Sequence, residues 1–366
     1  MERTAGDAPS AETRSPNAGP PTPRFPFSFE LFPPRNAQAE KALPSTIAAL
    51  AAEAPEFISV TYGAGGSSRE SSLDVLRSIR ENTIVEPMAH LTCVGSSHFD
   101  ANRLVRQFLD AGITSFLAVR GDPPLGAAEG DHFLGDLRTA SELVQLIHRV
   151  QTERAQYATV ASRGTAGIGH LRAARPKVRV AVAAFPNGHP RSQRSNQDID
   201  VLLAKQTSGA TLAITQLFFN ADDYFALVTA ATAAGVTIPI VPGLMPATSP
   251  EKLRRILQLS GEREPVDFAR QLGAASGEKG QFEVGVAHAT ALAAELVAGG
   301  APSLHLYTHN RHEAVLQILA RINALGTPVA TAHVASAAGA SRPVAAQSAA
   351  QQSAEIQSAA HQKESA

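Results

Sequence analysis

The stretch FSFELFPPR, residues 27–35, contains one carboxylate within an apolar run and ends in two prolines. An extended chain has a side-chain period of two, so the three apolar residues of FSFEL face one way and Ser28 and Glu30 face the other. Proline donates no backbone hydrogen bond and restricts the residue before it, so the strand is expected to end just past Glu30. The sequence therefore predicts a strand with an acid near its carboxyl end.

Seven further β-rich runs follow this one, and helical patterns separate successive runs. The eight predicted strands are 27–31, 57–62, 88–93, 115–120, 178–185, 212–219, 238–244 and 304–308. Such alternation requires parallel pairing with helical crossovers, and about eight units in roughly 300 residues match an α/β fold of the (β/α)8 barrel type. An open doubly wound sheet is the alternative.

The predicted domain organisation is one catalytic barrel over residues 25–324, with a polar insertion at about 151–177. Residues 1–24 are rich in Pro, Ala, Ser and Thr, and residues 325–366 are rich in Ala, Ser and Gln, without apolar periodicity. We expect both ends to be disordered tails.

The composition indicates a globular protein without an excess of either charge. The chain of 366 residues is 44% hydrophobic and 18% charged, with a formal net charge of −1, which predicts no attraction to nucleic acid or a membrane surface. The single cysteine, Cys93, excludes an internal disulfide and a multi-cysteine metal site, and a cytoplasmic location is expected. His305, His309 and His312 are close in sequence, but no carboxylate cluster completes a site, so no metal is expected.

A second strand repeats the opening pattern, because SFLAVRGDPP (115–124) reaches Asp122 and then two prolines. In a barrel all strands point the same way, so Glu30 and Asp122 would share the C-terminal rim, where barrel enzymes build their active sites. Paired carboxylates there could hydrolyse glycosides, but a chain with no Trp and 5% aromatic residues offers few stacking surfaces. The other class is cofactor-dependent redox chemistry, and the composition does not choose between the two.

Several separated motifs, taken in order, point to one known family. They are FSFELFPPR, FISVTYGAGG, MAHLTC, AVRGDPP, VAAFPNGHP, AITQLFF, VPGLMP and LYTHNR. Over residues 25–324 this series resembles the catalytic domain of the methylenetetrahydrofolate reductases. The resemblance implies a barrel that binds FAD non-covalently and transfers a hydride from NADH or NADPH to 5,10-methylenetetrahydrofolate. The product, 5-methyltetrahydrofolate, supplies methyl groups for methionine synthesis.

The resemblance also implies roles for individual residues. Glu30 matches the general acid, and Asp122 matches an aspartate beside the flavin and pterin, where its charge would stabilise a cationic intermediate. Gln216 and Arg311 match folate-binding residues. The positions implied for FAD are Thr61, Tyr62, His90, Arg120, Gly121, Asp122, Phe185, His189, Asp198 and Lys205.

This chain departs from the family pattern at a few positions. Phe185 stands where many members have Tyr, and Lys252 and Ile256 stand where the enterobacterial type has Gln and Phe. The resemblance implies a homo-oligomer. Regulation by S-adenosylmethionine is not expected, because the sequence after the eighth predicted strand and its helix offers no folded region large enough for the regulatory domain of the eukaryotic enzymes. The alternatives are direct hydride transfer without flavin, or a barrel that binds folate or flavin without turnover.

Overall fold

The computed structural model describes residues 25–62, 69–121, 135–162, 177–190, 192–194 and 196–325, all within one compact unit. Its strands are β1 (Phe27–Leu31), β2 (Phe57–Val60), β3 (Glu86–Thr92), β4 (Ser115–Val119), β5 (Arg179–Ala184), β6 (Leu212–Thr215), β7 (Ile240–Val241), β8 (Gly243–Leu244) and β9 (Leu304–Tyr307). All of these strands pair in parallel, in the order β7-β6-β5-β4-β3-β2-β1-β9-β8.

The sheet closes at Pro242, which divides the predicted strand 238–244 into β7 and β8. The first piece pairs with β6 and the second with β9, so the two ends of the strand order are joined by a single residue. The carbonyl of Pro242 accepts a hydrogen bond of 2.9 Å from the His305 amide, so hydrogen bonding to β9 continues at the residue between β7 and β8. Nine strand segments therefore make eight barrel strands, and the predicted (β/α)8 fold is confirmed.

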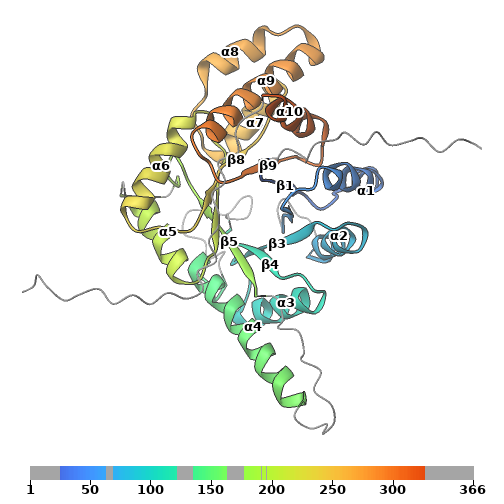
Figure 1. The fold of residues 1–366 in the computed structure, drawn as a ribbon, viewed down its shortest axis with the longest axis vertical. Coiled ribbons are helices and arrows are strands. Elements are labelled where there is room, and N and C mark those ends of the chain that lie inside the picture. The colour runs from blue at the N-terminus through green and yellow to red at the C-terminus, as the bar shows by residue number, and fades with distance from the viewer. Residues whose placement is uncertain are drawn as a thin grey trace, which may run out of the picture. The chain divides into compact units, whose positions relative to one another are not determined.

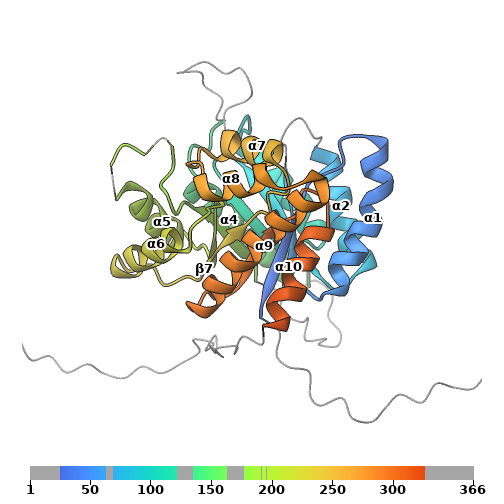
Figure 2. The same ribbon diagram turned by 90° about the horizontal axis from the view of Figure 1, so that it is seen from above.

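Helices surround the strands as an outer ring (Figure 1). They are α1 (Ala37–Ala52), α2 (Arg69–Asn82), α3 (His98–Asp110), α4 (Ala140–Ser162), α5 (Gln197–Thr207), α6 (Ala221–Ala233), α7 (Pro250–Ser260), α8 (Val266–Ala274), α9 (Gly277–Ala298) and α10 (Glu313–Ala324). The two views agree that α1 and α2 lie side by side on one flank and α5 and α6 on the opposite flank (Figures 1 and 2). Side-chain caps at Asn36, Ser97, Asn220 and Ser249 begin four of these helices.

The predicted polar insertion at about 151–177 begins within a helix, because α4 continues through residue 162. Residues 163–176 lie outside the described part of the chain.

No helix among the described residues is long and apolar enough to cross a membrane.

The barrel interior contains both apolar and polar side chains. Apolar interior side chains come from β2 to β7 and form one cluster: Phe57, Met88, Leu117, Ala181, Leu212, Ile214 and Val241. Polar side chains on β9, β1, β2 and β3 complete the interior, and they include Ser28, Glu30, Ser59, His90 and His305. The other face of β1 packs under the helices through Phe27, Phe29 and Leu31, as its period of two predicts.

Candidate active site

Glu30 lies inside the barrel between two histidines from other strands. One carboxylate oxygen, Oε2, is 3.5 Å from Nε2 of His90 on β3 and 3.8 Å from Nε2 of His305 on β9. The Ser28 hydroxyl lies 2.8 Å from Nδ1 of the same His305. Only 7% of the Glu30 surface is exposed, and the Thr308 hydroxyl donates a 2.7 Å hydrogen bond to its backbone carbonyl. The acid is therefore held at a fixed position near the carboxyl end of β1.

The histidine nearest to Glu30 carries no positive charge at neutral pH. Burial lowers the pKa of His90, and the nearby His305 lowers it further, while the charge of Glu30 opposes both effects. Burial, followed by the charge of Glu30, raises the pKa of Tyr307 well above its usual range, so its hydroxyl stays protonated and donates to the Thr215 carbonyl at 2.8 Å. A neutral His90 gives the Glu30 carboxyl no ionic partner on that side of the interior.

A second group of polar side chains surrounds the end of β5. Lys205 is buried and donates a 2.7 Å hydrogen bond to the Ala183 carbonyl. Burial lowers the pKa of Lys205 to about 8, Arg120 lowers it further, and Asp198 opposes the shift. Asp198 also accepts a 3.1 Å hydrogen bond from the His189 amide. The fold thus brings together Arg120, His189, Asp198 and Lys205, four positions that the sequence predicted as cofactor-binding.

Two buried hydroxyls in the barrel interior have no hydrogen-bond partner among the described residues. They are Ser59 Oγ on β2 and Thr61 Oγ1 just past its end. An unsatisfied buried polar group costs about 1–3 kcal/mol, so such atoms indicate a ligand that bonds to them. Gly121 lies at the same rim, where its φ of +86° and a Cβ position only 2.6 Å from Val94 Cγ2 leave no room for a side chain. These residues fit a polar cofactor held close to the backbone of the rim.

Not every predicted site residue joins these groups. The Tyr62 ring is buried in the outer core and makes an edge-on contact with Phe108 of α3, at 6.5 Å between ring centroids. The Phe185 ring, by contrast, does contact the second group, edge-on to His189 at 4.8 Å between ring centroids. Gln216 directly follows β6 and accepts a hydrogen bond from the Leu217 amide. Asp122 and the segment 63–68 lie outside the described residues.

Arg311, Lys252 and Ile256 lie in the segments that follow β8 and β9. Arg311 is exposed and follows β9 by a few residues. Lys252 and Ile256 lie on α7, where Ile256 is buried in a small apolar cluster with Leu217 and Phe268.

The sequence analysis did not predict that Ser28, His305 and Tyr307 lie close to Glu30 in the site. The period of two in FSFEL and LHLYT carries the signal, because Ser28 lies on the same face as Glu30 and His305 on the same face as Tyr307. The Phe32 and His309 rings stack at 5.4 Å with an interplanar angle of 4°, next to the site. Among the described residues, no group of three or more His, Cys, Asp or Glu side chains could hold a metal ion.

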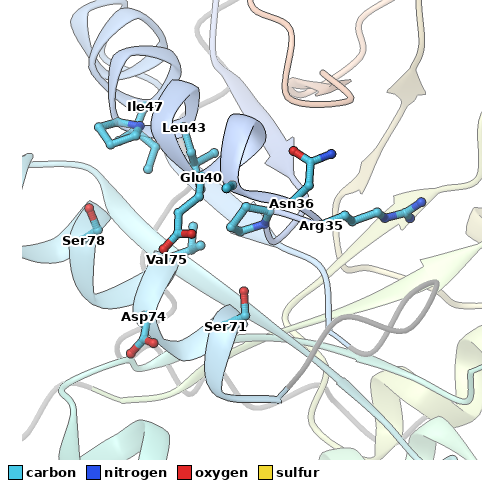
Figure 3. A pocket seen from close by; sticks show the side chains of 12 residues that line it. Arg35, Asn36, Glu40, Leu43, Ile47, Ser71, Asp74, Val75 and Ser78 are labelled. Atoms are coloured by element: carbon cyan, nitrogen blue, oxygen red, sulfur yellow. The ribbon is translucent and has the colours of Figure 1, made fainter.

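A cavity of about 630 Å³ lies outside the barrel, between α1 and α2 (Figure 3). Its lining includes Glu40, Ser71 and Asp74, and none of the predicted site residues takes part. Arg35 stands at its edge with its guanidinium pointing away from both acids. This cavity is therefore separate from the site around Glu30.

A family model described as methylenetetrahydrofolate reductase matches residues 18–323. A 5,10-methylenetetrahydrofolate reductase of Pectobacterium carotovorum subsp. carotovorum is 29% identical over 291 residues, which cover 79% of this chain and 87% of the relative. The protein of the same name from Escherichia coli (strain K12) is 28% identical, covering 78% and 86% of the two chains.

More distant similarity extends to a plant protein and to a solved structure. A probable methylenetetrahydrofolate reductase (NADH) of Oryza sativa subsp. japonica is 29% identical over 82% of this chain, but the match spans only 48% of that longer protein. A Clostridium thermocellum protein that binds two copies of 5-methyl-5,6,7,8-tetrahydrofolic acid has a TM-score of 0.53 at 10% identity, covering 82% of this chain and 95% of its own. At that identity the likeness concerns the fold alone.

Proposed function

The chain belongs to the methylenetetrahydrofolate reductase family, and from this premise we propose that it reduces 5,10-methylenetetrahydrofolate to 5-methyltetrahydrofolate, with a bound flavin and NADH or NADPH as hydride donor. The observation that carries the proposal is the buried carboxyl of Glu30, held inside the barrel mouth beside a neutral His90. A carboxyl in such surroundings suits proton donation to a bound substrate.

Glu30 would protonate a nitrogen of the folate's imidazolidine ring. Breaking the adjacent carbon–nitrogen bond then leaves a cationic iminium on the folate, whose carbon accepts a hydride. The Thr308 hydroxyl, bound to the Glu30 carbonyl, and the parallel pairing of β1 with β2 and β9 hold the carboxyl in place during this step. A positioned general acid typically contributes about 10²–10⁴-fold to the rate.

The residues present fit a flavin, whose bound isoalloxazine supplies hydride-transfer chemistry. Thr61 offers a buried hydroxyl that has no partner among the residues the structure describes. Arg120, His189 and Lys205 supply positive charge or hydrogen-bond donors suited to a pyrophosphate. Phe185 offers an apolar ring beside His189. Asp122, which the structure does not describe, is proposed to stabilise positive charge on the folate.

Direct hydride transfer without flavin, and binding without turnover, are the competing functions. The visible absorbance of the purified protein separates them from the proposed function, because a bound oxidised flavin colours the protein yellow. Bleaching by NADH, followed by return of colour on addition of methylenetetrahydrofolate, would support the proposal. A colourless protein that still turns over would favour direct transfer.

Glu30→Gln tests the role of the acid, since an amide keeps the size of the side chain but supplies no acidic proton. We expect turnover with methylenetetrahydrofolate to fall at least about 10²-fold while bleaching by NADH keeps its parental rate. Glu40→Gln, the same change on the outer surface of α1, serves as the matched control and should leave both rates unchanged. Equal slowing of both steps in Glu30→Gln would mean that Glu30 only shapes the site.

A further inference from the structure

Asn187 lies in the loop after β5, and its side chain bonds to two other segments of the rim. The amide nitrogen Nδ2 donates to Glu262 Oε2 at 2.7 Å and to Asp223 Oδ2 at 3.1 Å. Asp223 belongs to the first turn of α6, and Glu262 lies in the turn between α7 and α8, residues 261–265. We call these three side chains the Asn187 clasp, because one amide joins three segments that follow different strands.

The two carboxylates that share this amide repel each other. Burial raises the pKa of Glu262, the hydrogen bond from Asn187 lowers it in part, and the charge of Asp223 raises it again. Arg263, the neighbouring cation, lowers this pKa by its charge. The amide of Asn187 therefore offsets the repulsion between two anionic side chains of different segments, and it does so without a charge of its own.

Apolar packing does not anchor the turn between α7 and α8. Leu259 and Val266, the apolar residues on either side of the turn, are 64% and 69% exposed. A cavity of about 330 Å³ lies at the junction, bounded by Phe219 as well as by the Asn187 clasp. One close backbone approach is present, because a Cβ at Gly261 would lie 3.2 Å from Pro190 Cγ. Hydrogen bonds of the Asn187 clasp therefore tie this turn to the loop after β5.

The loop after β5 carries two positions that the proposed function assigns to the flavin. Phe185 and His189 lie on either side of Asn187, and their rings are 4.8 Å apart. Gly188 turns the chain between them, with a φ of +79° and an N–H that donates to the Phe185 carbonyl at 3.2 Å. The His189 amide donates to Asp198 of α5 at 3.1 Å. The loop is thus held by α5 at His189 and by the clasp at Asn187.

Resting on the proposed function, we propose that Asn187 is a positioning residue, whose two hydrogen bonds hold the loop after β5 in the shape in which Phe185 and His189 contact the flavin. Asn187 acts through these two residues and not on the reacting atoms. Loss of the amide would release the loop and the α7–α8 turn together, because the same group holds each to the other. Both segments should then move more freely, and the flavin should leave the protein faster.

Asn187→Ala tests the clasp, because it removes both hydrogen bonds. Deuterium uptake of the amides in residues 185–189 and 261–265, followed by mass spectrometry, should become about threefold to tenfold faster. Flavin release, followed by the rise of flavin fluorescence on dilution, should become faster by a similar factor. Asn323→Ala, the same change at an exposed position of α10, is the matched control and should leave both rates unchanged.

Asn187→Asp separates positioning from a general loss of stability. Its new carboxylate would face Asp223 of α6 and Glu262 and Glu264 of the turn, with Arg263 as the cation at the same junction. At about pH 8 this repulsion should release flavin faster than Asn187→Ala does. At about pH 5 a protonated carboxyl can donate to its neighbour, so release relative to the parent should slow in Asn187→Asp but not in Asn187→Ala.

Three results would overturn the proposal: parental deuterium uptake in both segments of Asn187→Ala, faster uptake without faster flavin release, or flavin release from Asn187→Asp with the same pH dependence as from Asn187→Ala. A parent that binds no flavin would refute the proposed flavin chemistry and the role of Asn187 towards it. Deuterium uptake in Asn187→Ala would still decide whether the clasp holds the turn, so the two failures are distinguishable.

Discussion

The hydroxyl of Ser28 lies 2.8 Å from Nδ1 of His305, although 277 residues separate the two in the chain. Both side chains are fully buried, and β1 and β9 pair so that Ser28 stands opposite His305. The other ring nitrogen of His305 faces Glu30 at 3.8 Å. One hydrogen bond therefore orients a ring that borders the proposed acid.

Ser28→Ala tests that hydrogen bond. Removing the hydroxyl leaves His305 Nδ1 buried without a partner, so we expect the free energy of unfolding to fall by about 1–3 kcal/mol. Urea-induced unfolding measures this change. Ser276→Ala is the matched control, because Ser276 is exposed before α9 and its side chain makes no capping hydrogen bond. The control should alter the free energy of unfolding by less than about 0.5 kcal/mol.

If Ser28→Ala is as stable as Ser276→Ala, the bond between Ser28 and His305 contributes nothing to the fold.

Gly121→Ala and Gly235→Ala separate two effects of adding a Cβ: backbone strain at a positive φ, and steric contact with a neighbouring side chain. Both glycines have a positive φ, +86° and +94°, but an added Cβ meets Val94 Cγ2 at 2.6 Å only at Gly121, with nothing within 4 Å at Gly235. We expect Gly235→Ala to lose about 1–2 kcal/mol of stability and Gly121→Ala to lose about 1–3 kcal/mol more.

Flavin content measures the functional part of the same comparison. Gly121→Ala should purify with less flavin than Gly235→Ala when both are prepared with excess FAD. Equal stability and equal flavin content in the two variants would show that the contact between an added Cβ at Gly121 and Val94 affects neither folding nor flavin binding.

Lys205 gives the protein a specific dependence on pH. Its pKa falls to about 8 in the folded protein from an ordinary value of 10.5, mainly through burial. Between these values the unfolded chain binds more protons than the folded chain, so the Lys205 contribution to stability rises with pH and is unfavourable below about pH 8.

Lys205→Met should remove this dependence. The slope of unfolding free energy against pH between pH 8 and 10.5 should be lower in the variant than in the parent, by up to about 1.4 kcal/mol per pH unit. Unfolding in urea at a series of pH values measures the slope, and Lys41→Met provides an exposed control. Parallel curves for the parent and Lys205→Met would contradict the lowered pKa.

The local patterns of the chain predicted much of the fold. The apolar run and the two prolines of residues 27–35 predicted where β1 ends and that Glu30 faces away from Phe29. Most strands in the structure are shorter than the predicted runs, because residues such as Thr61 and Gln216 lie at the rim beyond regular pairing, whereas β1 matches its run and β3 begins two residues before its run, at Glu86. The helical part of 151–177 was not predicted, because its Glu153 and Arg154 pair with Arg106 and Asp110 of α3, contacts between two elements that no local pattern contains.

The sequence by itself determined the order of strands and helices, the face to which Glu30 belongs and, through its series of motifs, the family. The period of apolar residues and the effect of proline extend over only a few residues. Both can be recognised in the sequence without knowing which distant residues lie nearby. Only the tertiary structure decided that the barrel closes at Pro242, that Ser28 bonds to His305, and that Glu30 lies beside His90 and His305. These relationships join segments far apart in the chain, and the free energy that selects them comes from burial and pairing across the closed sheet, which no local pattern contains.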